Sequence, residues 1–201
     1  MKIFETMRIE QGVIPRVYYH TKRIRSSSAA LGFLFNETAW ESKLSSIQAT
    51  YNQGIYRLKI ELSKDGTFEI KVEPLMYKPY FTAKLQSIDN ATETSLLINK
   101  TSQRQHLTHN HTTDLILLYN EYKILEFDIG NIMIEEQGKY YTPSYQHDFL
   151  PGCKRQEMID QGKLFEKDYT VDMLKEGLQK QEIKIYLINS LREVADVSIY
   201  L

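Results

Sequence analysis

The residues with the clearest capacity for chemistry are three histidines in one short stretch, His106, His109 and His111. Imidazole nitrogens are common ligands of zinc and other transition metals, so a metal site is the first hypothesis. On a helix, His106 and His109 would share a face and His111 would not, and no carboxylate or thiol stands at ligand spacing. The pattern favours a solvated polar segment, and we expect no metal.

The second candidate is Cys153, which is followed directly by Lys154 and Arg155. Cations beside a thiol favour the nucleophilic thiolate. No histidine stands nearby to act as its base, so a small buried residue is the better interpretation. Cys153 is also the only cysteine of the chain, which excludes an internal disulfide framework and is typical of a reducing compartment.

The composition narrows the class of protein. Of the 201 residues, 42% are hydrophobic and 25% are charged, which is typical of a soluble globular protein. Basic and acidic residues number 25 and 26, so no overall charge would attract nucleic acid or an anionic membrane. The sequence has no apolar run near the ~18 residues of a membrane span and no signal-peptide core. We therefore expect a cytoplasmic protein with no nucleic-acid partner and no membrane partner.

The elements that would position these residues follow from alternation and turn signals. Asp65-Gly66 stands between two alternating segments, and this dipeptide is among the strongest predictors of a β-hairpin. Pro74 and Pro79 bracket a break, which predicts a domain boundary near residue 76. The strands expected from composition and alternation cover residues 3–9, 13–19, 81–88, 114–120, 131–136, 139–144, 183–189 and 197–201. The expected helices cover residues 21–33, 39–51, 103–110, 154–161 and 170–179, with a polar loop over 89–94.

Seven short segments carry a more specific signal together than any of them does alone. In chain order they are FETMRIEQG, HTKRIRSSSAALGF, RLKIELSKDGTFEI, NKTSQR, LEFDIGNIMI, YYTPSYQHDFLPGCKR and INSLREVADV. In this order and spacing the chain resembles the class IV aminotransferases. Within them it is most similar to the aminodeoxychorismate lyases, with branched-chain and D-amino acid aminotransferases as the wider family. The resemblance runs from residue 3 to about residue 199.

The resemblance implies a fold, a cofactor and partners. The implied fold class is α+β, with two small α/β domains over residues 1–76 and 77–201 and the cofactor in the cleft between them. The implied cofactor is pyridoxal 5′-phosphate (PLP). The implied partners are a small-molecule amino substrate and a second copy of the chain in a homodimer.

The resemblance also assigns roles to single residues. Lys100, in NKTSQR, matches the catalytic lysine that bonds covalently to PLP and then moves the substrate proton, which requires an amine. Glu126 matches the glutamate that faces the pyridine nitrogen, and Asn131 matches an asparagine five residues later. Phe4 and Arg8 match the strand that lines the substrate pocket.

The phosphate of PLP would be held by three further segments. Arg23, in a variant of the family's H-x-x-R-L pattern, would contact the phosphate, for which a guanidinium offers a planar fork of donors. Backbone amides that open a helix would receive the same anion, and a second turn would complete the cup. The residues implied in these two segments are Gly152, Cys153, Lys154, Ser190 and Leu191.

Three functions remain as hypotheses. The first is a PLP-dependent lyase that converts 4-amino-4-deoxychorismate to 4-aminobenzoate and pyruvate for folate biosynthesis. The second is an amino acid aminotransferase of the branched-chain or D-amino acid type. The third is a weakly active PLP-binding protein. Here only Met1 to Ile3 precede the FET segment, the family's arginine-glycine-tyrosine loop is absent, and Leu107 stands where a tyrosine is common.

Overall fold

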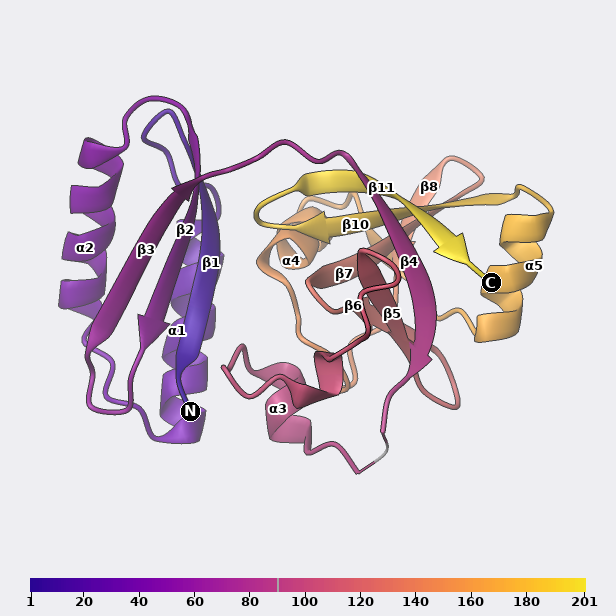
Figure 1. The fold of residues 1–201 in the computed structure, drawn as a ribbon, viewed down its shortest axis with the longest axis horizontal. Helices are drawn as coiled ribbons and strands as arrows, with labels where there is room; N and C mark the ends of the chain where they lie inside the picture. Colours follow the sequence, from indigo (N-terminus) through magenta and orange to yellow (C-terminus); the bar gives the residue numbers. More distant parts are fainter. Residues whose placement is uncertain (90) are drawn as a thin grey trace. The chain divides into compact units, whose positions relative to one another are not determined.

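The computed structural model describes residues 1–89 and 91–201 and divides into two compact units (Figure 1). The first unit contains Met1–Tyr77 and Asn99–Gln103, and the second contains the described residues of Lys78–Ile98 together with Arg104–Leu201. Of the predicted polar loop 89–94, Asn90 lies outside the described residues. Within the described ranges, every helix is too short or too polar to cross a membrane.

The first unit is a three-stranded antiparallel sheet covered by two helices. The strands are adjacent in the order β1 (Ile3–Glu10), β2 (Ile55–Leu62) and β3 (Phe68–Pro74). The hairpin predicted at Asp65-Gly66 is confirmed. The Asp65 carboxylate accepts a hydrogen bond from the Thr67 amide, and Gly66 has a φ of 90°, which glycine adopts without strain.

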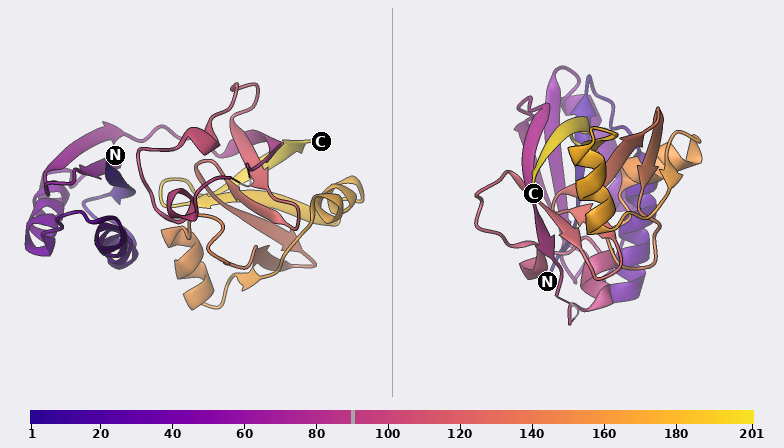
Figure 2. Two further views of the ribbon diagram at one scale, coloured as in Figure 1. Left: turned by 90° about the horizontal axis from the view of Figure 1, so that it is seen from below. Right: turned by 90° about the vertical axis from the view of Figure 1, so that its right-hand side faces the viewer.

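Helices α1 (Val17–Leu31) and α2 (Glu37–Thr50) cover one face of this sheet (Figure 2, left). Along β1 every second residue is buried, because successive side chains of a strand point to opposite faces. The apolar residues of this buried face pack against those of the helices. The cluster contains Ile3, Met7, Ile9, Ile14, Ile24, Phe33, Trp40, Leu44, Ile47, Leu58, Ile60 and Leu62.

The strand predicted over residues 13–19 is wrong. Val13 makes only an isolated bridge with Glu10, and Arg16 has the left-handed φ of 64° directly before α1 begins at Val17. The run VYY has β-type composition, but its position at the start of an amphipathic helix overrides that local preference. The other end of α1 follows the sequence signal, because Gly32 terminates the helix in the left-handed conformation.

Residues 99–103 lie beside β1 at its free edge. The Phe4 amide donates to the Lys100 carbonyl at 2.9 Å, and the Ser102 amide donates to the Lys2 carbonyl at 2.8 Å. Ile3 and Thr101 form an isolated antiparallel bridge. The segment that carries Lys100 therefore belongs to the sheet of the first unit, although about 90 residues of chain separate it from β1.

The second unit is built on an eight-stranded sheet in the order β10-β11-β4-β5-β6-β7-β8-β9, and an additional pairing of β10 with β7 closes six of these strands into a ring. β4 runs parallel to both of its neighbours, β5 and β11. The strands are β4 (Tyr80–Ser87), β5 (Leu115–Tyr119), β6 (Ile124–Phe127), β7 (Gly130–Glu136), β8 (Lys139–Thr142), β9 (Phe165–Glu166), β10 (Ile183–Asn189) and β11 (Glu193–Tyr200).

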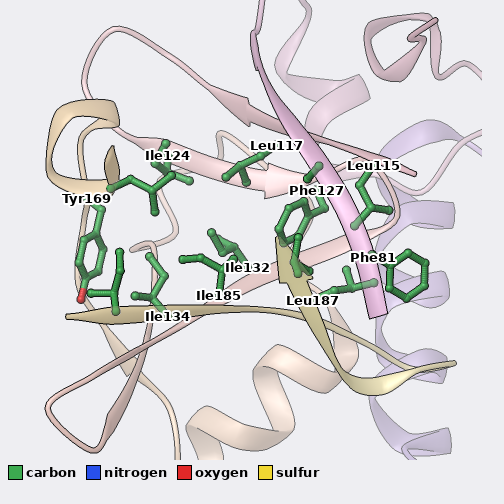
Figure 3. Packing of buried hydrophobic residues seen from close by; sticks show 14 of the residues in the cluster. Phe81, Leu115, Leu117, Ile124, Phe127, Ile132, Ile134, Tyr169, Ile185 and Leu187 are labelled. Carbon is green, nitrogen blue, oxygen red and sulfur yellow. The ribbon is translucent and has the colours of Figure 1, made fainter. Parts of the chain in front are cut away.

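Apolar side chains from the strands of this ring, together with Tyr169 and Leu174, form the main core of the second unit. Figure 3 shows Leu117, Phe127, Ile132 and Leu187 among the residues that cluster there. Four helical segments complete the unit: α3 (Thr94–Ile98), a 3₁₀ turn (Gln105–Leu107), α4 (Cys153–Asp160) and α5 (Val171–Gln179). This core holds in place the strands β6 and β7, which carry the candidate residues Glu126 and Asn131.

Most of the elements predicted in this half are confirmed within a few residues, but four differ, one of them the unpredicted two-residue strand β9. The helix expected over 103–110 is only the 3₁₀ turn, and His111 has a left-handed φ of 54°. The Asn110 side chain accepts hydrogen bonds from the amide and hydroxyl of Thr112, so local turn bonds replace helical ones. Strand β6 and helix α3 were not expected, because each is shorter than the window in which periodicity is visible.

Candidate functional site

In the first unit, one candidate residue lies in a cluster of charged side chains under the sheet. Glu5 is on the buried face of β1, and His20 and Arg23 are three residues apart on α1, so both reach the same region. Arg23 donates from Nε and Nη2 to the two Glu5 oxygens at 2.7 and 2.6 Å. His20 Nδ1 lies 2.6 Å from Glu5 Oε2. The cluster thus joins the strand to the helix through one carboxylate.

The cluster keeps Glu5 ionised at neutral pH. Burial alone would raise the pKa of this carboxyl, but the Arg23 guanidinium and then His20 outweigh burial and lower the pKa of Glu5 to about 2. The side chains of Glu5 and His20 are 1% and 0% exposed, and that of Arg23 is 12% exposed. The sequence resemblance assigns a role to Arg23 but none to Glu5 or His20. The sequence feature that could have indicated the burial of Glu5 is the alternation along the strand, because Glu5 lies on the same face as the buried Ile3 and Met7.

Lys100 and Phe4, which we expected to share a site, lie close together. Lys100 Nζ is 5.3 Å from the centre of the Phe4 ring, and Lys59 Nζ is 4.8 Å from the same centre. Phe4 and Arg8 point to the face of β1 opposite Glu5, since they are in the other phase of the strand. Arg8 donates to Glu10 at 3.0 Å. The first unit therefore holds a lysine, an aromatic ring and further cations beside one strand.

In the second unit, Glu126 and Asn131 are direct cross-strand partners at the turn between β6 and β7. Both are buried, and both bind the same stretch of backbone ahead of α4. Glu126 Oε1 accepts from the Leu150 amide at 3.0 Å. Asn131 donates to the Leu150 carbonyl and accepts from the Gly152 amide, each at 2.9 Å. Two side chains predicted as site residues thus fix the backbone that leads into the helix.

Gly152 is the residue before the first turn of α4, where a helix presents unbonded amides and the positive end of its dipole. Having no side chain, Gly152 cannot itself cap these amides. A Cβ at Gly152 would lie only 2.1 Å from Asn131 Oδ1, so this position accepts only glycine while Asn131 keeps its place. Cys153, the first residue of the helix, is buried, as expected.

The turn between β10 and β11 contains the remaining predicted residues. The Asn189 side chain accepts from the amides of Leu191 and Arg192 at 2.9 and 2.7 Å, which sets the conformation of the turn around the buried Ser190. Lys154 Nζ, from the first turn of α4, lies 3.0 Å from a carboxylate oxygen of Glu193. The ion pair links the start of α4 to this turn.

The histidine stretch differs from the expectation of a solvated polar segment. His109 has a side chain that is 3% exposed, and its Nε2 lies 3.5 Å from Asp128 Oδ2. The rings of His109 and His111 are 4.3 Å apart. Because the predicted helix does not form, the helix-face argument is wrong, and for His109 the solvated interpretation is wrong as well. Burial raises the pKa of Asp128, and it lowers the pKa of His106.

Each unit offers its own set of chemically capable groups. The first unit offers an amine, Lys100, beside an aromatic ring, and an arginine, Arg23, held by a carboxylate. The second offers a helix N-terminus preceded by a glycine, which is a general anion site, and a buried carboxylate, Glu126. The roles assigned to these side chains remain predictions.

Comparison with known proteins gives consistent matches. Residues 2–200 match a family model described as amino-transferase class IV. A Schizosaccharomyces pombe protein named as a proposed aminodeoxychorismate lyase is 26% identical over 205 residues, which cover 96% of this chain and 87% of that protein.

Solved structures show the same fold. A proposed amino-acid aminotransferase from Mesorhizobium loti is 26% identical, with a TM-score of 0.82 and coverage of 99% of both chains. A hypothetical aminotransferase from Mycobacterium tuberculosis, solved in a PLP-bound form, is 15% identical with a TM-score of 0.82, covering 98% of this chain and 81% of that one. These matches confirm the predicted fold class.

Proposed function

Because the chain belongs to the amino-transferase class IV family, whose members are PLP-dependent enzymes, we propose that it is a PLP-dependent 4-amino-4-deoxychorismate lyase. The proposed products are 4-aminobenzoate and pyruvate, and the proposed setting is folate biosynthesis. The observation that carries the lyase assignment is the similarity to the Schizosaccharomyces pombe protein over 96% of this chain.

The residues present fit PLP at its phosphate end. The first turn of α4 is preceded by Gly152, which has no side chain to cap the amides of that turn, so no side-chain hydrogen bond caps the helix at this position. A phosphate dianion suits a helix N-terminus of this kind, because the amides point at it and the dipole favours negative charge. We propose that the amides of Cys153 and Lys154, the hydroxyl of Ser190, the amide of Leu191 and the guanidinium of Arg23 bind the phosphate.

The residues present also fit the reactive end. Lys100 is half-buried beside Phe4, and an amine in a partly desolvated position is suited to covalent bonding and proton transfer. Bound PLP supplies an electron sink for the carbanion at the substrate carbon that bears the amine. We propose that Lys100 Nζ removes the proton from this carbon. The Glu126 carboxylate would hold a proton at the pyridine nitrogen, Asn131 would support it, and Phe4 and Arg8 would contact the substrate.

An aminotransferase is the second candidate, favoured by the 26% identity to the Mesorhizobium loti protein over the full length of both chains. The two reactions share the proton removal at Lys100 and differ afterwards. A lyase expels pyruvate and regains the starting cofactor, whereas an aminotransferase returns the proton to the cofactor and leaves pyridoxamine phosphate.

The experiment that separates them uses the purified protein loaded with PLP. In one arm 4-amino-4-deoxychorismate is added, and 4-aminobenzoate and pyruvate are measured. In the other arm branched-chain and D-amino acids are added, and pyridoxamine phosphate is measured. We expect stoichiometric pyruvate and 4-aminobenzoate in the first arm and no pyridoxamine phosphate in the second. The reverse pattern would establish the aminotransferase, and no product in either arm would contradict both.

We further propose that the protein works in the cytoplasm as a homodimer. Its single cysteine is typical of a reducing compartment. Two-fold pairing is the commonest oligomeric arrangement of soluble enzymes, and the sequence resemblance implies it here. A light-scattering mass at micromolar concentration tests the dimer, and a monomer mass with full PLP occupancy would contradict it.

A further inference from the structure

The cluster of Glu5, His20 and Arg23 places buried charged groups in an otherwise apolar row of β1. Its neighbours on the buried face of β1 are apolar, namely Ile3, Met7 and Ile9. Taking a carboxylate and a guanidinium out of water is expensive, and well-packed apolar residues of similar volume are often as stabilising or more so. An ion pair retained in an apolar row is therefore better explained by what it does than by what it adds to stability.

The contacts in the cluster fix the orientation of one group, the Arg23 guanidinium. An arginine side chain has many rotamers, and ordering it costs conformational entropy. Glu5 receives two parallel hydrogen bonds from it, at 2.7 and 2.6 Å, and such a bidentate pair fixes the plane of the guanidinium.

Glu5 is itself held by a second group. His20 Nδ1 approaches Glu5 Oε2 at 2.6 Å, so the carboxylate is bound from both sides, by the helix residue His20 and by Arg23. All three side chains have low exposure, and the strand and helix that carry them pack on one apolar core. The order of support therefore runs from His20 to Glu5 to Arg23.

We propose that Glu5 and His20 are positioning residues that hold the Arg23 guanidinium ready for the phosphate of PLP. The inference rests on the proposed function only in taking PLP as the ligand. Neither Glu5 nor His20 needs to touch the cofactor for this role.

A simple charge effect gives the opposite expectation. The Glu5 carboxylate neutralises Arg23, and its pKa of about 2 keeps it ionised at neutral pH. If only charge mattered, removing the negative charge of Glu5 would strengthen the binding of a phosphate dianion. If position matters more, removing it frees the guanidinium and weakens that binding. The sign of the change in affinity for PLP therefore distinguishes a charge effect from a positioning effect.

The experiment compares PLP with pyridoxal, which has the same ring and aldehyde but no phosphate, on the apoprotein by fluorescence titration. In Glu5→Gln the amide keeps the shape, but one of the two acceptor oxygens becomes an NH2 donor, so the bidentate pair with Arg23 cannot form. We expect the dissociation constant for PLP to rise about tenfold, which corresponds to ~1.4 kcal/mol, and that for pyridoxal to change less than twofold. A merely structural defect would weaken both ligands alike and would overturn the proposal, as would unchanged or tighter PLP binding.

Two variants of His20 test the proposal independently of Glu5. His20→Asn retains an N–H donor near Nδ1 and should keep PLP affinity within about threefold, whereas His20→Phe removes the donor and should resemble Glu5→Gln. This pair decides the question if Glu5→Gln does not fold, and equal PLP affinities of the two variants would overturn the proposal. The control is Glu73→Gln, which removes an exposed carboxylate partner of Arg57 in the same sheet and should change neither affinity. A wild-type protein that does not bind PLP would refute the proposed function itself.

Discussion

The closeness of Gly152 and Asn131 leads to a prediction about stability. The substitution Gly152→Ala should destabilise the protein when Asn131 is present and should not do so when Asn131 is replaced by alanine. Gly152 has φ −70° and ψ 145°, which any L-residue adopts, so Gly152→Ala introduces no backbone strain. Its Cβ would lie 2.1 Å from Asn131 Oδ1. Asn131 or the backbone must shift, which breaks the bonds from the Gly152 amide and to the Leu150 carbonyl.

The size of the effect follows from these contacts. Two buried hydrogen bonds are worth about 1 kcal/mol each, and overpacking a buried site costs about 1–3 kcal/mol. We expect Gly152→Ala to lower the free energy of unfolding by about 3–5 kcal/mol. In the Asn131→Ala background the obstacle is gone, and the same change should be neutral or stabilising by up to ~1 kcal/mol, because alanine restricts the unfolded chain.

The assay is urea unfolding of wild type, the two single variants and the double variant, all without PLP. The four free energies of unfolding form a double-mutant cycle. The double variant should be more stable than the sum of the two single effects predicts, by more than about 1.5 kcal/mol. Additive effects within ~0.5 kcal/mol would refute the reasoning, since they would mean that the two residues do not meet.

Three other substitutions test other parts of the site. Lys100→Ala should lose the yellow absorbance of lysine-bound PLP and lower turnover by about 10⁴-fold or more, while circular dichroism stays that of wild type; retained colour would contradict the assignment. Glu126→Gln keeps an acceptor for the Leu150 amide but not the charge, so kcat should fall more than PLP affinity; near-wild-type kcat would exclude a role at the pyridine nitrogen. The lowered pKa of Glu5, from 4.5 to about 2, means that its ionised form stabilises the fold fully above about pH 4.5 and progressively less as the pH falls towards 2. Relative to Glu5→Gln, the wild type should therefore lose about 3 kcal/mol of unfolding free energy between pH 6 and pH 2 in denaturant titrations; parallel pH profiles would contradict that ionisation.

The sequence predicted the turns and helix ends whose conformation is set by the residues at that position. The hairpin at Asp65-Gly66 and the end of α1 at Gly32 follow from residues that act on their own backbone. The stretch Val17 to Tyr19 has strand composition, yet it lies in a helix because α1 must continue to His20 and Ile24, which it buries. Single-residue preference could not show that.

For the candidate site too, some features could be predicted from short segments and others required the structure. The resemblance identified Lys100, Glu126 and Gly152 from short segments, and the structure adds what holds them. The pairing of residues 99–103 with β1 and the binding of the Leu150 backbone by Glu126 join segments far apart in the chain. Periodicity cannot reveal such contacts, because it contains no information about which segments meet.

The ring of six strands in the second unit has a consequence for how the protein folds. β4, the first strand of the unit, begins at Tyr80 and has β11 as one of its two neighbours, and β11 ends at Tyr200. Contacts between such distant segments raise the contact order and slow folding, because the loop between them must close first. Removal of Glu193–Tyr200 would leave one side of β4 with unsatisfied backbone groups, and exposed strand edges promote aggregation. The second unit therefore becomes complete only when β11, which ends at Tyr200, has been added, whereas the first unit already has all its strands and helices by residue 103.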